Sequence, residues 1–256
     1  MTTTTIEPAP STALKATTVV DRAQSRDVST PLTLVSAKLL MAITGAGLIG
    51  FVAVHMLGNL QIYLGQEALN AYAKFLKSMP ALLWTARIGL LAIFALHLGL
   101  AVYLKKQNKS ARPHQYALSD PVGATLASRT MLSSGLVIFA FLIYHLLHFT
   151  LGVTDSGSHK LVDLAGRHDV YSMVVMSFGN IYISASYIIA MLFLGLHLSH
   201  AISSMFQTFG LTNASSRRLI HRVGLVVAAF LMVGNISIPV AVLLGFIGLP
   251  AEGPTP

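Results

Sequence analysis

The sequence predicts an all-α membrane protein whose five transmembrane helices form one bundle. Three observations lead to this prediction: 54% of the 256 residues are hydrophobic, only 10% are charged, and the mean hydropathy is +0.69. A soluble domain usually has about a quarter of its residues charged, so this chain has too few polar side chains to cover a water-facing surface.

Residues 1–35 are rich in Thr, Ser, Ala and Pro without a continuous apolar run, which predicts a flexible cytoplasmic tail instead of a secretory signal peptide. Five apolar stretches follow, and each reaches the roughly 20 residues that a helix needs to cross about 30 Å of hydrocarbon. They are Ser36–Leu64, Leu82–Leu104, Thr130–Leu151, Ile181–Phe209 and Val223–Leu249. Residues 36–250 therefore form one transmembrane domain, and residues 251–256 form a short C-terminal tail. No tandem repeat or soluble domain is visible.

The fifth stretch contains a helix-breaking segment from Asn235 to Pro239. Neighbouring helices are expected to satisfy the backbone groups that this break leaves without partners.

Lys and Arg are distributed unequally between the two sides of the predicted bundle. Twelve lie in the tail through Lys38 and in the segments after the second and fourth helices, against five on the other side. This asymmetry predicts a multi-pass protein of the cell membrane with its N-terminus in the cytoplasm and its C-terminus outside. Attraction to anionic lipid explains these charges, whereas nucleic-acid binding would require a basic stripe with interleaved aromatic residues.

The chain has ten histidines and no cysteine, which excludes disulfides, iron–sulfur clusters held by this chain, thiolate zinc sites and covalent c-type haem. An ionisable residue inside a membrane is costly, so it is expected to face the bundle interior and to have a partner or a function. Six histidines lie in predicted spans: His55, His97, His145, His148, His197 and His200. The other four, His114, His159, His168 and His221, lie in loops or at a helix edge and are expected to be solvated or interfacial.

The depths of these histidines predict two pairs. At 1.5 Å per residue from the cytoplasmic edge, His55 lies about 26 Å deep and His145 about 24 Å. His97 lies about 12 Å deep, His197 about 20 Å and His200 about 15 Å, which gives a second, shallower pair. Two such pairs, with all nine acidic residues outside the spans, favour bis-imidazole, non-covalent b-type haem over a zinc site or a proton relay. Gly58, Gly99 and Gly195 could admit a flat macrocycle, although helix packing is the commoner role of small residues.

The runs HMLGNL from His55, EALNAY from Glu67 and HLLHF from His145 are the most specific parts of a pattern that covers roughly residues 36–249. This pattern resembles the membrane-anchor cytochrome b of succinate dehydrogenase and fumarate reductase, and more narrowly the single-chain, five-helix, dihaem branch of that family. The resemblance implies that the first four helices each supply one haem ligand. Helices one and three would hold the distal haem, and helices two and four the proximal haem.

His55 and His97 are the only histidines in their spans, so the resemblance assigns them as ligands directly. The third helix offers His145 and His148 and the fourth offers His197 and His200, each pair three residues apart on nearly the same face.

In the third helix, the family pattern of a His-Leu pair after an apolar run favours His145. In the fourth, Gly210 stands thirteen residues after His197, as the family pattern requires, although Ala201 occupies a position where Gly is usual. The expected pairs are thus His55 with His145 and His97 with His197, with His148 and His200 as alternates.

The resemblance further implies a complex in which a flavoprotein oxidises succinate and an iron–sulfur subunit passes electrons to this chain. With no cysteine and no Gly-rich dinucleotide fingerprint, this chain would only exchange electrons with quinone, which in this branch is usually menaquinone. Arg87 is a candidate partner of a haem propionate, or else an interfacial anchor. On the inner side, Ser36, Lys38 and Arg129 are candidates for the proximal haem or a quinone.

Glu67, on the outer side, could handle a quinol proton or be a solvated loop acid. Two alternatives to this function stay open. One is the cytochrome b subunit of another membrane oxidoreductase, of the hydrogenase or formate dehydrogenase type. The other is a haem-free transporter or assembly protein.

Overall fold

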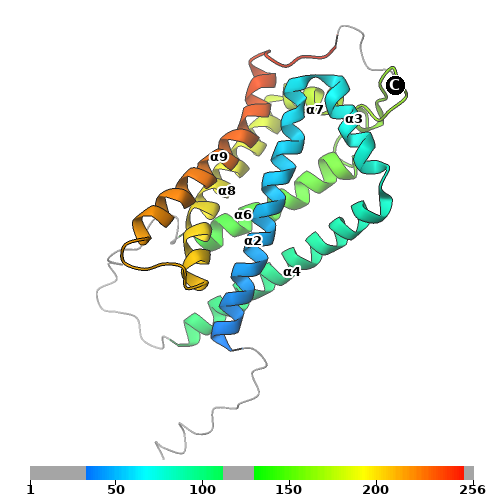
Figure 1. Ribbon diagram of the computed structural model, residues 1–256. Helices are drawn as coiled ribbons and strands as arrows, with labels where there is room; N and C mark the ends of the chain where they lie inside the picture. Colours follow the sequence, from blue (N-terminus) through cyan, green and yellow to red (C-terminus); the bar gives the residue numbers. More distant parts are fainter. Residues whose placement is uncertain (1–32, 112–129, 251–256) are drawn as a thin grey trace, which may run out of the picture.

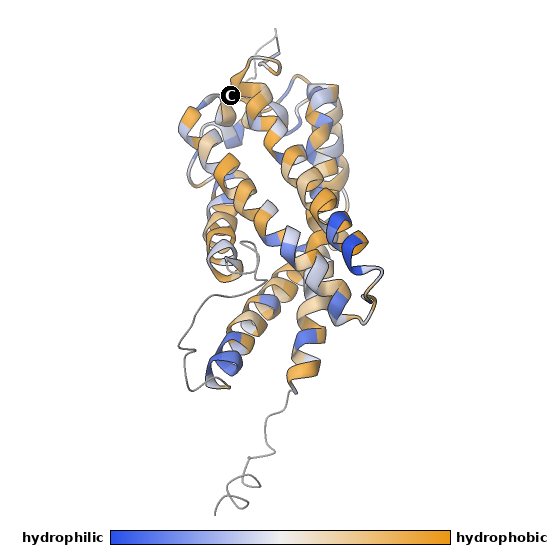
Figure 2. Cartoon of the chain, turned by 90° about the vertical axis from the view of Figure 1, so that its left-hand side faces the viewer, coloured by the Kyte–Doolittle hydropathy of each residue, from blue (hydrophilic) through white to orange (hydrophobic). Residues whose placement is uncertain are grey.

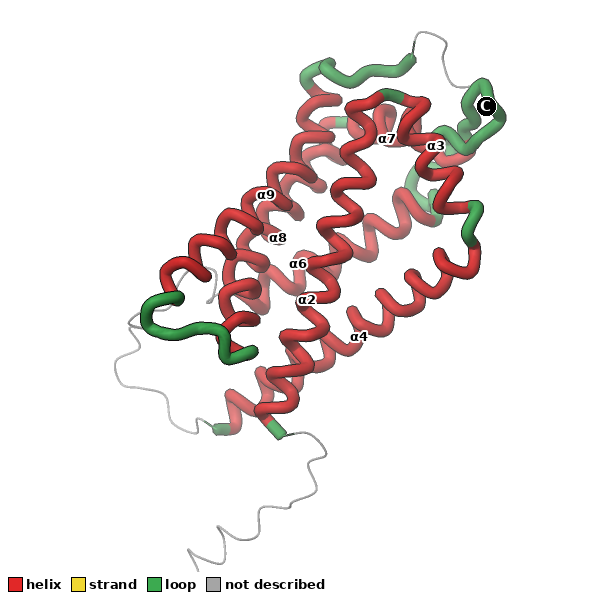
Figure 3. The backbone as a smooth tube through the Cα atoms, in the orientation of Figure 1, coloured by secondary structure: helices red, strands yellow, loops and turns green. Residues whose placement is uncertain are grey.

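The computed structural model describes residues 33–111 and 130–250, which are helical apart from turns, short loops and one isolated β-bridge between Val162 and His168 (Figure 3). Five helical segments in this part of the chain are long and apolar enough to cross a membrane. They are Leu34–Leu64, Pro80–Ser110, Met131–Thr150, Ile181–Thr208 and Arg217–Leu243. The predicted all-α, five-span architecture is confirmed. Most of the two predicted tails, His114 and Arg129 lie outside the described residues.

Two of the spans change their helical type near one end. Helix α2 (Leu34–Asn59) continues as the 3₁₀ turn η1 (Leu60–Leu64), and α6 (Met131–His145) continues as the π-helical turn η2 (Leu146–Thr150). The other spans are α4 (Pro80–Ser110), α8 (Ile181–Thr208) and α9 (Arg217–Leu243). Side-chain caps fix the starts of two of these helices. Thr33 accepts a hydrogen bond from the Ser36 amide, and Asn180 accepts from the amides of Tyr182 and Ile183.

The fifth span differs from the prediction. Helix α9 begins at Arg217, six residues before the apolar stretch, and ends at Leu243 instead of Leu249. The expected break is absent, because the helix continues through a fully buried Pro239. Proline removes only one backbone donor, and the Asn235 side chain adds a 2.7 Å hydrogen bond to the Leu231 carbonyl one turn earlier.

Two shorter helices, which the sequence pattern did not predict, lie at one end of the bundle (Figure 1). They are α3 (Gln66–Lys77), which follows a turn at Gly65 with φ of 95°, and α7 (Val170–Gly179). Helix α3 has an apolar face and a charged face, and it packs on α7. We call the end of the bundle that carries α3 and α7 the capped end.

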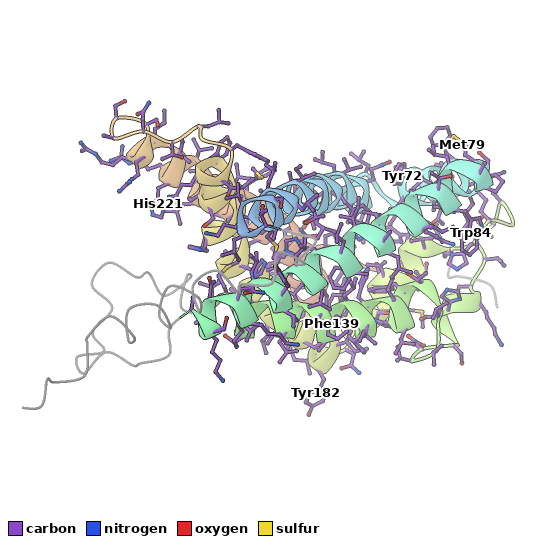
Figure 4. The ribbon with its side chains drawn as sticks, turned by 90° about the horizontal axis from the view of Figure 1, so that it is seen from below. Tyr72, Met79, Trp84, Phe139, Tyr182 and His221 are labelled. Atoms are coloured by element: carbon purple, nitrogen blue, oxygen red, sulfur yellow. The ribbon has the colours of Figure 1, made fainter. Side chains whose placement is uncertain are left out.

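Helix α2 lies at the centre of the arrangement and packs against α4, α8 and α9, while α6 packs on α8 (Figure 1). The rings of Phe94 on α4 and Phe139 on α6 stack with centroids 6.0 Å apart, and Figure 4 labels Phe139. One buried apolar cluster joins α7, α8 and α9 at the capped end, and a second surrounds the fully buried Met56 between α2, α8 and α9. The bundle is therefore held chiefly by contacts to α2 and α8.

Glycines let several of these helices approach closely. A Cβ atom at Gly58 would lie 2.9 Å from the Tyr72 ring of α3, and one at Gly195 would lie 2.7 Å from the Met232 sulfur of α9. No atom beyond its own helix lies within 4 Å of a Cβ built at Gly99. Gly58 and Gly195 therefore serve helix packing, which was the preferred interpretation of the sequence.

The surface of the bundle has the character of a membrane protein. Apolar residues cover the long helices, and hydrophilic residues gather toward helix ends and in the loops (Figure 2). Trp84 and Tyr182, near the starts of α4 and α8, are exposed, and Tyr182 extends away from the bundle (Figure 4). Aromatic residues in such positions commonly anchor helices at the membrane interface. Because the number of spans is odd, α2 begins at the end of the bundle opposite to the end where α9 finishes (Figure 1).

Candidate functional site

The structure brings His55 of α2 and His145 of α6 face to edge near the capped end. Their ring centroids are 5.8 Å apart and their planes are almost perpendicular, at 88°. Phe51 stacks on His55, and Phe141 and Phe149 pack around His145. We call His55 and His145 the first pair. It joins two helices that are separate in the sequence.

We call His97 of α4 and His197 of α8 the second pair, because each contacts one of the two helices that carry the first pair. Each is held by a hydroxyl group from a neighbouring helix. The Thr44 Oγ1 of α2 lies 3.0 Å from His97 Nδ1, and the Ser134 Oγ of α6 lies 3.2 Å from His197 Nδ1. Helices α2 and α6, which carry the first pair, thus also contact the two histidines of the second pair.

The hydrogen bonds of these hydroxyls define the protonation of both rings. Thr44 Oγ1 donates its only proton to backbone carbonyls of its own helix, 2.8 Å to Leu40 and 3.1 Å to Met41. Ser134 Oγ donates to the Met131 carbonyl at 3.1 Å. With these donations in place each hydroxyl accepts from histidine, which assigns the proton to Nδ1 and leaves Nε2 with a free electron pair. Nε2 is then the nitrogen available to a metal.

The two pairs occupy two levels of the bundle. Each histidine of the first pair follows a second-pair contact residue on its own helix by eleven positions, 44 to 55 on α2 and 134 to 145 on α6. Eleven residues are close to three full helical turns, so both residues of a helix share one face and lie about 16 Å apart along the axis. This two-level arrangement agrees with the depths calculated from the sequence.

The same spacing belongs to a short sequence pattern that occurs in both α2 and α6. The pattern M-x2-[ST]-G-x9-H-x-L occurs from Met41 and again from Met131, exactly ninety positions later. The partner helices share L-H-L around His97 and His197. A search for repeats at a long offset would have found it. The two copies are not in tandem, and only the residues at the contacts are shared, while the rest of each helix is generic apolar sequence.

His148, the alternate in the third span, lies in a different environment from His145. It is 2% exposed, stacks on Tyr144 and Phe149, and its Nδ1 lies 2.9 Å from the Tyr187 hydroxyl. Tyr187 also lies 3.4 Å from His145 Nδ1. His145 is the one that faces His55, whereas His148 is packed among aromatic rings with an Nε2 that has no hydrogen-bond partner. The geometry favours His145 as the partner of His55.

His200, the alternate in the fourth span, is engaged within its own helix. Its Nε2 lies 3.0 Å from the Ser204 hydroxyl one turn later. His197 instead contacts α6 through Ser134, and a Cβ at Gly135 would lie 3.5 Å from its Cε1 atom. On α2, a Cβ at Gly45 would likewise lie 3.4 Å from the Cε1 atom of His97. The geometry thus favours His197, which has the same kind of surroundings as His97.

The donor sets fit haem better than a bare metal ion. Within residues 33–111 and 130–250, no group of three or more His, Asp or Glu side chains could hold an ion. Haem iron already has four macrocycle nitrogens and needs two axial ligands, which is what each pair offers. Two imidazoles that bind one iron through Nε2 at about 2 Å have ring centres about 6 Å apart, close to the observed separation of the first pair.

The other sequence candidates are not brought together with the histidine pairs. Arg87 is exposed on α4, and its guanidinium lies 5.2 Å from the Trp84 ring centroid, as expected of an interfacial anchor. Ser36 hydrogen-bonds with Thr33 at the start of α2, and Lys38, two residues later, is exposed. A role for these residues toward haem or quinone stays a prediction.

Glu67 is not a free carboxylate. It forms a two-pronged ion pair with Arg167 of the loop before α7, at 2.8 Å and 2.5 Å. Arg167 also binds Asp163 at 2.7 Å, and its hydrogen bond to Glu67 lowers the pKa of that glutamate. Glu67 is solvent-exposed, as expected, but it lies in the first turn of α3 and its ion pair ties α3 to this loop.

A buried amide completes this network at the capped end. Asn70 is fully buried, donates to Asp163 at 3.1 Å and to Asp169 at 2.9 Å, and accepts from the Tyr171 amide. The network borders a recess of about 210 Å³ lined by α3 and this loop. His159 and His168 pack together beside it with ring centroids 5.1 Å apart. These two histidines and the exposed His221 at the start of α9 (Figure 4) lie away from both pairs.

Comparisons with known proteins add nothing to this geometry: no family model, no curated protein and no solved structure matches the chain.

Proposed function

We propose that this protein is a dihaem cytochrome b that carries electrons across a membrane, and more specifically the membrane anchor of a succinate:quinone oxidoreductase. The observation that carries the proposal is the presence of two histidine pairs, one above the other, on four membrane-spanning helices. Each pair supplies the two imidazoles of one b-type haem. The narrower assignment is supported by the resemblance of HMLGNL, EALNAY and HLLHF to that family.

In this proposal His55 and His145 hold one haem, and His97 and His197 hold the other. Bound haem supplies a reversible one-electron centre at each level. The chain fixes the ligands from four different helices, and the apolar residues around them exclude water. Because the two levels lie about 16 Å apart along the helices, electrons would pass between the two faces of the membrane.

The proposed partners are a flavoprotein subunit and an iron–sulfur subunit, because this chain has neither a Gly-rich dinucleotide fingerprint for a flavin nor a cysteine for a cluster. The small-molecule substrate would be a quinone, which in this branch of the family is usually menaquinone. The positive-inside rule places these partners at the end of the bundle opposite the capped end.

A dithionite-reduced minus oxidised spectrum of the purified protein tests the central claim. We expect a b-type α band and two haems per chain. A protein that carries no haem after expression in a haem-replete host would overturn the proposal and favour a transporter or an assembly protein.

Single variants then test the ligand assignment. His55→Ala and His145→Ala are expected to remove the same haem, and His97→Ala and His197→Ala the other. His148→Ala and His200→Ala serve as matched controls that retain both. If a control variant loses a haem while the variant of the histidine three residues before it retains both, the control histidine is the ligand.

Co-purification tests the narrower assignment. We expect a flavin-containing subunit, an iron–sulfur subunit and succinate-dependent dye reduction. A nickel or molybdenum partner would instead identify the cytochrome b of a hydrogenase or formate dehydrogenase.

A further inference from the structure

The hydroxyls of Thr44 and Ser134 form a matched set that the proposed ligands alone do not explain. Both residues lie in the repeated M-x2-[ST]-G pattern, both donate to a carbonyl of their own helix, and both contact the Nδ1 of a histidine on another helix. The same arrangement thus occurs twice, at places far apart in the sequence.

The first pair has no equivalent pair of hydroxyls. His145 has the Tyr187 hydroxyl at 3.4 Å, which is shared with His148. His55 lies among aromatic contacts with Phe51 and His145. The two levels therefore differ in the groups that face the Nδ1 side of their imidazoles.

A hydrogen bond donated by Nδ1–H raises the electron-donating power of Nε2 and fixes the orientation of the ring. A more basic axial ligand stabilises ferric over ferrous iron, so it lowers the midpoint potential of the haem. At the second level both histidines have a hydroxyl acceptor at Nδ1, so both would lower the midpoint potential of the haem that they share.

We propose that Thr44 and Ser134 are positioning residues that hold His97 and His197 as Nδ1-protonated ligands and thereby lower the potential of the haem between them. This inference rests on the proposed function. It adds two residues and the direction in which they shift the midpoint potential of one of the two haems.

Redox titration of Thr44→Val and Ser134→Ala tests the inference. Both variants keep the side-chain volume nearly constant, so we expect both haems to be retained. The midpoint potential of one haem should become more positive, and it should be the same haem in both variants. Thr44→Ser and Ser134→Thr should restore the wild-type potential.

Matched controls separate this effect from a general change in packing. Thr85→Val on α4 and Ser237→Ala on α9 remove hydroxyls that donate only to their own helices, at 2.8 Å to Ala81 and 2.8 Å to Gly234. Neither control should shift a potential. Tyr187→Phe should shift the other haem, because Tyr187 contacts the first pair.

The possible failures are distinguishable. If the wild-type protein contains no haem, the proposed function fails. If it contains two haems but Thr44→Val and Ser134→Ala leave both potentials unchanged, or shift different haems, the inference fails while the function stands.

Discussion

At the scale of single residues, the carboxylates and the histidine of the capped end respond to pH in a defined direction. Burial raises the pKa of Asp163, but hydrogen bonds from the Arg167 backbone, Asn70 and the Arg167 side chain outweigh it and hold that pKa below its ordinary value of 3.8. Asp169 is held low in the same way by Ser172 and its neighbours. Burial and the nearby Lys77 lower the pKa of His168 below its ordinary value of 6.5.

All three shifts make the capped end less stable in acid. A group whose pKa is lower in the folded state contributes stability above its unfolded pKa and loses it as pH falls. The protection factors of the α3 amides, which compare each exchange rate with the intrinsic rate at the same pH, should therefore be largest at neutral pH, fall below about pH 6.5 as His168 becomes charged, and fall further below about pH 4.

The variant His168→Gln isolates the upper part of this response. We expect it to abolish the change between pH 7 and 5 and to leave the acid limb, which belongs to Asp163 and Asp169. An unchanged response in this variant would show that another group is responsible.

Sequence reasoning found the four proposed ligands and missed Thr44, Ser134 and Tyr187. A histidine in an apolar span is rare and therefore conspicuous, whereas Ser and Thr are common in such spans and usually bond to their own helix. What distinguishes Thr44 and Ser134 is a contact with a different helix. Only the packing of the helices shows that contact. In the sequence, the pattern shared at an offset of ninety residues marks the two positions as similar.

At the scale of helices, close packing around glycine holds α9 to the bundle. A Cβ at Gly234 would lie 2.3 Å from the sulfur of Met56 on α2, and Met56 is fully buried, so it has little room to move. The same substitution at Gly50 meets no atom within 4 Å.

We expect Gly234→Ala to lower the thermal midpoint of the detergent-solubilised protein by several degrees, corresponding to roughly 1–3 kcal/mol of overpacking. Gly50→Ala is the matched control, expected to be neutral or slightly stabilising because alanine favours helix more than glycine does. Equal midpoints for the two variants would contradict the packing seen between α2 and α9.

The five spans were predictable because apolar length is a strong signal, but α3, α7 and the end of α9 were not. Helix α3 is short and half polar, so its helical pattern is weak beside the long spans, and its position depends on Asn70 and Arg167 contacts that join distant segments. Pro239 was expected to interrupt α9 because an isolated helix rarely tolerates proline. Burial among neighbouring helices allows it.

At the scale of the whole molecule, the orientation in the membrane is a prediction that the absence of cysteine makes easy to test. Ser156, between α6 and α7, and Ser215, between α8 and α9, are exposed. The two loops that contain them lie at opposite ends of the bundle (Figure 1). A cysteine introduced at either position would be the only thiol in the chain.

In intact cells, a membrane-impermeant maleimide should label Ser156→Cys and leave Ser215→Cys unlabelled until the membrane is permeabilised. This result follows from the excess of Lys and Arg at the end that carries Ser215. The reverse pattern would invert the topology and, with it, the proposed docking side of the partner subunits.

The order of the proposed ligands along the chain determines when each haem can bind during synthesis. Each proposed haem takes one imidazole from α2 or α4 and one from α6 or α8, so the first two spans cannot complete a pair of ligands by themselves. After α2 and α4 have entered the membrane, the nascent chain presents only half-sites. Stable haem capture at the first level must wait for α6, and at the second level for α8. Binding of both haems would therefore indicate that the chain has been synthesised at least through α8.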